Sequence, residues 1–99
     1  MTKNETKEKL ASEVKALVKF AGCFFPTPSD FFQMLSSENF DKVDIMIIDS
    51  AFKGLPICNY DKTLLLLQDD FINRLYEICN RLVSIIETLP IKSGDFSAI

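Results

Sequence analysis

Histidine and tryptophan are absent from this chain of 99 residues, and glycine occurs only three times. Histidine is the usual acid or base at neutral pH, so its absence lowers the expectation of general acid–base catalysis. A serine or cysteine nucleophile would have only lysine as its base, and three separated glycines make no phosphate-binding loop. The sequence therefore predicts a protein that is not an enzyme and that holds no cofactor.

Cysteine is sparse as well: Cys23, Cys58 and Cys79 lie far apart and form no CxxC pair. Zinc sites usually draw on such pairs and on histidine, so we expect no metal site. An odd number of separated cysteines is typical of free thiols in a reducing compartment. This pattern predicts a cytoplasmic protein with three free, buried thiols.

Long apolar runs are also missing. No stretch approaches 18 consecutive uncharged apolar residues, so we expect no membrane span. The sequence "KFAGC" at 19–23 resembles a lipoprotein cleavage box. However, Glu13, Lys15 and Lys19 interrupt the apolar segment that such a signal requires, and we reject this interpretation.

The net charge is −3, with a pI of about 4.8. The chain therefore lacks the basic excess that nucleic acids attract, and no nucleic-acid partner is expected. The charges are uneven, because residues 30–51 hold five acids and one lysine, whereas the first 20 residues hold five lysines and three glutamates. Solvated helix faces explain this pattern, and the alternative is an acidic docking face for a basic partner.

Apolar residues make up 47% of the chain, which is enough for a hydrophobic core. The length predicts one domain over residues 1–99. A chain of this size buries roughly two-thirds of its unfolded surface, so it needs no metal or disulfide staple. The strong periodic patterns are helical. The predicted fold is all-α, a small single-domain bundle of about four helices with a long C-terminal helix.

The first two helices have clear start signals. Thr2 and Glu5 have the spacing of a capping box, which predicts a first helix over 4–24. The dipeptide Thr27–Pro28 combines a good N-cap with proline at the first helical position. It predicts a short second helix over about 28–36.

A third helix is predicted over 38–53, with Ser36 or Ser37 as its N-cap and Gly54 directly after its end. The segment "VDIMIID" within it is rich in β-branched residues, so a strand is the competing interpretation. We favour the helix because no second convincing strand is available to pair with it.

The last helix is predicted over 61–89 and ends before Pro90. A continuous helix would be about 43 Å long, which exceeds a compact domain of this size. It therefore either projects or breaks near Gln68–Asp69, where Asp69 could act as a new cap. Residues 91–99 lack periodicity and are predicted to form a loose tail. Two i,i+4 ion pairs are expected on this helix, Asp70–Arg74 and Glu77–Arg81.

Two groups of apolar side chains exceed the core stripes of these helices. Each group fits either a core position or an exposed contact with a partner protein. The candidate partner contacts are Phe24, Phe25, Phe31 and Phe32 around the Pro-Thr-Pro turn, and Ile45, Ile48 and Phe52 on the flank of the third helix.

Four consecutive leucines, 64–67, form a third group. The heptad pattern of the last helix directs Leu64 and Leu65 to the core, and it places Leu66 and Leu67 on the polar face. Three explanations remain for Leu66 and Leu67. A neighbouring helix or the loop over 57–60 covers them, the helix breaks at Asp69, or they contact a partner.

These observations predict a small non-enzymatic interaction module, such as a regulator, inhibitor, antidote or adaptor, that binds a partner protein. The first alternative is a structural or assembly subunit that forms a homodimer through the long C-terminal helix. The second alternative is a helical immunity-type protein at a membrane face. Such a protein would carry a basic amphipathic helix, and only residues 3–19 approach that pattern.

Overall fold

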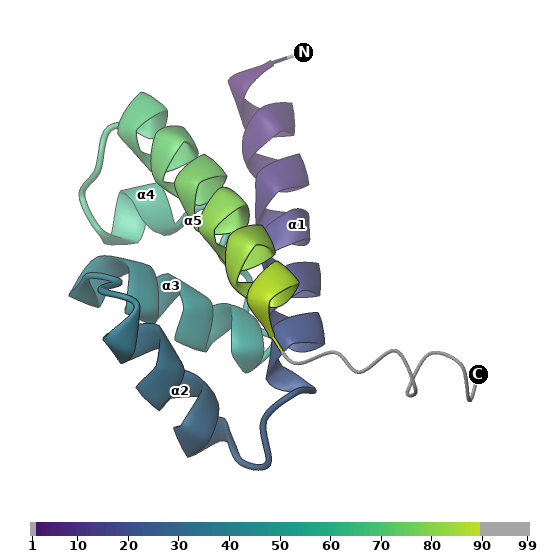
Figure 1. Cartoon of the computed structure of the whole chain (residues 1–99). Coiled ribbons are helices and arrows are strands. Elements are labelled where there is room, and N and C mark those ends of the chain that lie inside the picture. Colours follow the sequence, from purple (N-terminus) through teal and green to yellow (C-terminus); the bar gives the residue numbers. More distant parts are fainter. Residues whose placement is uncertain (1, 90–99) are drawn as a thin grey trace.

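The computed structural model describes residues 2–89, and all of their regular structure is helical (Figure 1). The predicted all-α fold is confirmed, and the described residues form five helices in place of about four. The predicted loose tail at 91–99 lies outside the described residues. The helices are α1 (Lys3–Gly22), α2 (Pro28–Ser37), α3 (Lys42–Phe52), α4 (Tyr60–Thr63) and α5 (Gln68–Thr88).

The long helices α1 and α5 lie side by side and run parallel, with α2, α3 and α4 on the same side of the pair (Figure 1). Their N-terminal ends meet, because Gln68 Nε2 donates to Asn4 Oδ1 at 3.1 Å and Lys3 pairs with Asp69 at 2.8 Å. Helix α3 also packs on α1. Helix α1 therefore packs against both α3 and α5.

The buried apolar residues form one cluster to which every helix except α4 contributes. Full burial of one valine, leucine, isoleucine or phenylalanine side chain contributes about 1.5–3 kcal/mol to the free energy of unfolding. The largest fully buried apolar side chains are Val14, Val18, Phe31, Leu35, Ile47, Ile48, Ile57, Phe71, Leu75, Ile78 and Leu82.

The predicted start signals of α1 and α2 are confirmed. Thr2 and Glu5 form the complete capping box, with the Glu5 N–H donating to Thr2 Oγ1 at 3.1 Å and the Thr2 N–H donating to Glu5 Oε1 at 3.2 Å. Thr27 caps α2 by accepting from the Asp30 N–H at 3.2 Å, and Pro28 is the first helical residue. Both signals lie within four residues of sequence, so local chemistry alone decides them.

The third helix is a helix and not a strand, but its predicted cap at Ser36 or Ser37 is wrong. Helix α2 continues through Ser37, and the chain then reverses at Asn39, whose φ is 63°. Asparagine tolerates this left-handed conformation better than most residues. The N-cap of α3 is Asp41, which accepts from the Asp44 N–H at 2.8 Å. The predicted stop is confirmed, since Gly54 follows α3 with a φ of 78°.

The predicted continuous helix over 61–89 is wrong, and the break near Gln68–Asp69 is found instead. Helix α4 ends at Thr63, and α5 begins at Gln68. Asp69 is not the cap, because Leu67 occupies the N-cap position and makes no side-chain hydrogen bond there. Asp69 lies in the first turn, where its negative charge favours the positive end of the helix dipole.

The three cysteines are free, and the predicted burial holds for Cys79. It is wrong for Cys23, which is exposed, and Cys58 is half-buried. Burial raises the pKa of the Cys79 thiol to about 11 and also raises that of Cys58. At pH 8 only about one Cys79 in a thousand would be a thiolate, the reactive form. We expect a thiol reagent to label Cys23 first and Cys79 only on unfolding, as followed by peptide mass spectrometry. Equal labelling rates for Cys23 and Cys79 would contradict this burial.

Candidate functional site

The four leucines form a short loop, residues 64–67, which we call the leucine loop. Leu64 and Leu66 are half-buried and pack against the core. Leu65 and Leu67 are 91% and 74% exposed. The prediction that Leu65 is a core residue is therefore wrong, because the helix ends before it and the heptad no longer sets its direction. Leu66, which the heptad left on the polar face, packs inward, and Leu67 remains exposed.

The backbone of the leucine loop forms a Schellman motif at the end of α4. The Leu66 N–H donates to the Asp61 carbonyl at 2.8 Å, and the Leu65 N–H donates to the Lys62 carbonyl at 3.4 Å. The motif places Leu65 in the left-handed region with a φ of 56°, where glycine is usual. A residue with a Cβ there costs roughly 1–2 kcal/mol. Leu65 thus adopts a strained conformation and buries almost nothing in return.

A buried ion pair fastens the base of the leucine loop to α1. Lys7 Nζ lies 3.2 and 3.1 Å from the two carboxylate oxygens of Asp61, and 3.4 Å from Asn59 Oδ1. Only 2% of the Lys7 side chain and 7% of the Asp61 side chain are exposed. The hydroxyls of Tyr60 and Ser50 lie 2.8 Å apart and link α4 to α3. These contacts hold α4 in place and so fix the direction of the exposed leucines.

An open pocket of about 390 Å³ lies next to the leucine loop. Leu66 is part of its wall, which connects the pocket to the loop. We call it the carboxylate pocket because four of its seven lining residues are acidic. The lining residues are Asp41, Asp44, Leu66, Asp70, Asn73, Arg74 and Glu77.

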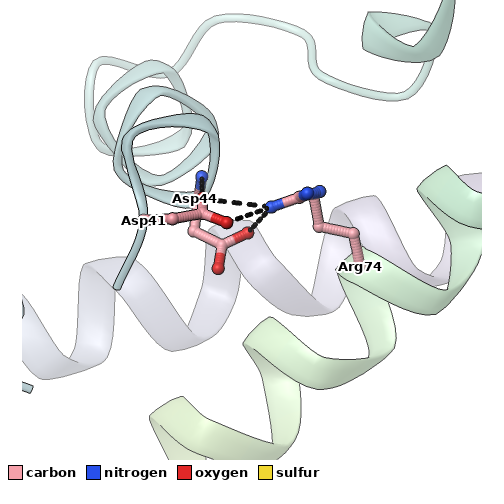
Figure 2. A network of polar contacts seen from close by, with 3 residues as sticks. All are labelled: Asp41, Asp44 and Arg74. Carbon is pink, nitrogen blue, oxygen red and sulfur yellow. Dashed lines mark hydrogen bonds and ion pairs between the residues drawn. The ribbon is translucent and has the colours of Figure 1, made fainter. Parts of the chain in front are cut away.

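Arg74 is the cation of this pocket and joins α5 to the start of α3 (Figure 2). Its Nη1 donates to both carboxylate oxygens of Asp41, at 3.1 and 3.0 Å, and to Asp44 Oδ1 at 2.7 Å. The predicted Asp70–Arg74 pair does not form, because the guanidinium reaches across to two carboxylates on another element. Such charge-assisted hydrogen bonds are stronger than an exposed pair along one helix.

The second predicted helix pair, Glu77–Arg81, does not form either. Arg81 donates to the Glu38 carbonyl and lies over the Phe40 ring at 3.9 Å from its centroid. Within residues 2–89, neither Asp70 nor Glu77 lies within ion-pair distance of a cation. Both carboxylates are exposed at the pocket and available to a positively charged group.

The two aspartates held by Arg74 have pKa values shifted in opposite directions. The Asp44 backbone N–H, and then the Arg74 guanidinium, hold the pKa of Asp41 below its ordinary value. Burial raises the pKa of Asp44 despite its bond to Arg74. Burial acts to lower the pKa of Arg74, but its bonds to Asp41 and Asp44 outweigh this, and the pKa is raised. The pocket therefore favours the charged form of the Arg74 guanidinium and disfavours the charged form of the Asp44 carboxylate.

We expect Asp41 to titrate at a lower pH than Asp44, as followed by the carboxyl carbon shifts in NMR spectra. Asp41 stabilises the fold above its ordinary pKa, and this contribution is lost as pH falls through its folded pKa. Asp44, whose pKa is raised, has the opposite effect on stability. Its buried charge destabilises the fold above its folded pKa, and protonation at lower pH removes this cost. Arg74→Met should raise both pKa values, because Arg74 lowers each of them. An Asp41 that titrates at or above Asp44 would contradict this arrangement.

Of the seven other predicted partner contacts, two are buried in the core and five are half-buried. Phe31 and Ile48 are fully buried, so the interpretation of these two as exposed contacts is corrected. The Phe31 ring packs against three other phenylalanines, with centroid distances of 5.3–5.7 Å, which is why it is withdrawn from the surface. Four of the predicted contacts are half-buried and pack on the core, namely Phe25, Phe32, Ile45 and Phe52. Phe24 is also half-buried and packs edge-on against the exposed Phe20 at 5.2 Å.

Two other features considered within residues 2–89 are a metal site and a membrane span. No group of three or more histidine, cysteine or acidic side chains in this part of the chain could hold a metal ion. None of the helices described here combines the length and apolar character of a membrane span. Comparisons with models of protein families, with curated proteins and with solved structures found no match.

Proposed function

We propose that this protein is a small non-enzymatic interaction module that binds a partner protein through the leucine loop. The observation that carries the proposal is Leu65, a large apolar residue that is 91% exposed and held in a left-handed conformation. Strained residues that persist in a fold are concentrated at functional sites. A regulator, inhibitor, antidote or adaptor in the cytoplasm fits this reading, and the three free thiols suit that compartment.

Burial of the two exposed leucines would stabilise a complex with a partner, but it does not stabilise the folded chain alone. Full burial of one leucine side chain contributes roughly 1.5–3 kcal/mol, and neither Leu65 nor Leu67 contributes this to the folded chain. A partner that covers both would gain that free energy. Because the Lys7–Asp61 pair fixes the base of the loop, less conformational entropy is lost when a partner binds.

The test is capture of partners from an extract of the native cells by the wild type and by Leu65→Asn/Leu67→Ser. Asparagine tolerates the left-handed conformation, so the variant should unfold in urea within about 1 kcal/mol of the wild type. Leu55→Ser is the matched control, because Leu55 is exposed at 47% and lies outside the loop. We expect the control to keep the captured protein and the double variant to lose it. Equal capture by all three proteins would count against the leucine loop.

The alternative of a homodimer has one observation in its favour. Tyr76 and Val83 are exposed and lie seven residues apart on α5, so they share one face of that helix. A dimer through this face would make the melting temperature rise with protein concentration. A melting temperature that is independent of concentration would exclude it.

A further inference from the structure

The leucine loop and the carboxylate pocket adjoin one another, because they share Leu66. Leu66 lines the pocket, and its two neighbours in the chain, Leu65 and Leu67, project into solvent. Asp70 follows Leu67 by three residues, close to one helical turn, and Glu77 lies seven residues further along α5. Positions three, four and seven apart share a helix face, so the two acids extend from the loop along α5.

The charge of this surface is strongly one-sided. Four carboxylates line the pocket, and its only guanidinium is already shared between Asp41 and Asp44. Asp70 and Glu77 have no ion-pair partner among the described residues, as noted above. An acidic or neutral partner that covered the leucines would bring these charges out of water without compensation, whereas a basic partner would pair with them.

We infer that the partner segment is basic as well as apolar. Its apolar side chains cover Leu65 and Leu67, and its lysine or arginine side chains enter the carboxylate pocket beside Asp70 and Glu77. This inference rests on the proposed function and adds the chemistry of the partner to it. The same negative surface would be repelled by an anionic membrane, which separates a basic protein segment from a lipid surface as the occupant.

The test is selection from a library of displayed random 16-residue peptides on the wild-type protein, with counter-selection on Leu65→Asn/Leu67→Ser. We expect the enriched peptides to combine apolar residues with a net positive charge. Their affinity should fall tenfold or more on Asp70→Asn/Glu77→Gln and should weaken as salt is raised. Glu13→Gln/Glu87→Gln is the matched control, because it removes two exposed carboxylates elsewhere and should leave the affinity within about twofold.

The outcomes separate the two claims. If leucine-dependent peptides are neutral or acidic, or if they tolerate Asp70→Asn/Glu77→Gln, the inference about the basic partner is overturned and the proposed function stands. If no enriched peptide depends on Leu65 and Leu67, both are overturned. Binding of the wild type to phosphatidylglycerol vesicles at physiological salt would also overturn the inference, because it would show an anionic lipid on the same surface.

Discussion

Replacement of Lys7 by methionine is expected to lower the free energy of unfolding by about 3–5 kcal/mol. Methionine matches the apolar stem of lysine but lacks the terminal ammonium group and its charge. Asp61 would then be a buried carboxylate without its cation, and Asn59 would lose its donor as well. The loss is large compared with the 5–15 kcal/mol that stabilises a typical domain. Helix α4, and with it the leucine loop, would be the first segment to detach.

Urea unfolding followed by circular dichroism measures this loss, and Lys3→Met supplies the matched control. Lys3 pairs with Asp69, but 62% and 67% of the two side chains are exposed, so its loss should amount to less than about 1 kcal/mol. The double variant Lys7→Met/Asp61→Leu should recover most of the stability, because an apolar pair replaces the ionic one. Similar losses for Lys7→Met and Lys3→Met would show that the Lys7–Asp61 pair is not buried as described.

Arg74→Met is expected to lower the free energy of unfolding by about 2 kcal/mol. The guanidinium makes three hydrogen bonds to two carboxylates, one of which, on Asp44, is largely buried. Its removal leaves Asp44 charged without a donor and frees Asp41 to serve only as the cap of α3. The contact between α3 and α5 would weaken, and the wall of the carboxylate pocket would lose its fixed shape.

The same urea experiment tests this prediction, with Lys53→Met as control. Lys53 pairs with Asp49 on the surface of α3 and should contribute less than about 1 kcal/mol. Adding Asp44→Asn to Arg74→Met should restore part of the stability, since it removes the uncompensated charge. An Arg74→Met variant as stable as the Lys53→Met control would mean that the network in Figure 2 contributes nothing measurable.

The features that the sequence predicts well are encoded locally. The capping box of Thr2 and Glu5, the Thr27–Pro28 start and the Gly54 stop each involve residues within a few positions of one another. Their hydrogen bonds form wherever the rest of the chain lies, and short-range spacing therefore identifies them. The all-α fold follows from the helical periodicity of the apolar residues, which is also a local pattern.

The features that could not be predicted depend on contacts between residues that are far apart in the sequence. Lys7 looks like one more lysine on a solvated face until the fold brings Asp61 beside it, 54 residues away in sequence. Arg74 selects carboxylates about 30 residues away over its neighbour four positions along the helix. For Arg74, the fold supplies in Asp44 a more buried partner than the local Asp70.

The sequence predicts the candidate site only in part. The count of four leucines shows that two of them lack a place in the core. The prediction for Leu66 and Leu67 assumes a continuous helix, and the break shifts the exposed pair to Leu65 and Leu67. Leucine at the left-handed position of a Schellman motif contradicts the usual preference for glycine, so no local signal identifies Leu65.

The central claim, that Leu65 is held out of the core to meet a partner, is tested most directly by site-specific photo-crosslinking. A photoreactive benzophenone amino acid would replace Leu65 in the native cells, and the same group at Leu55 would be the control. We predict one discrete covalent product of higher mass from position 65 and none from position 55. No product from position 65, or the same products from both positions, would contradict the claim.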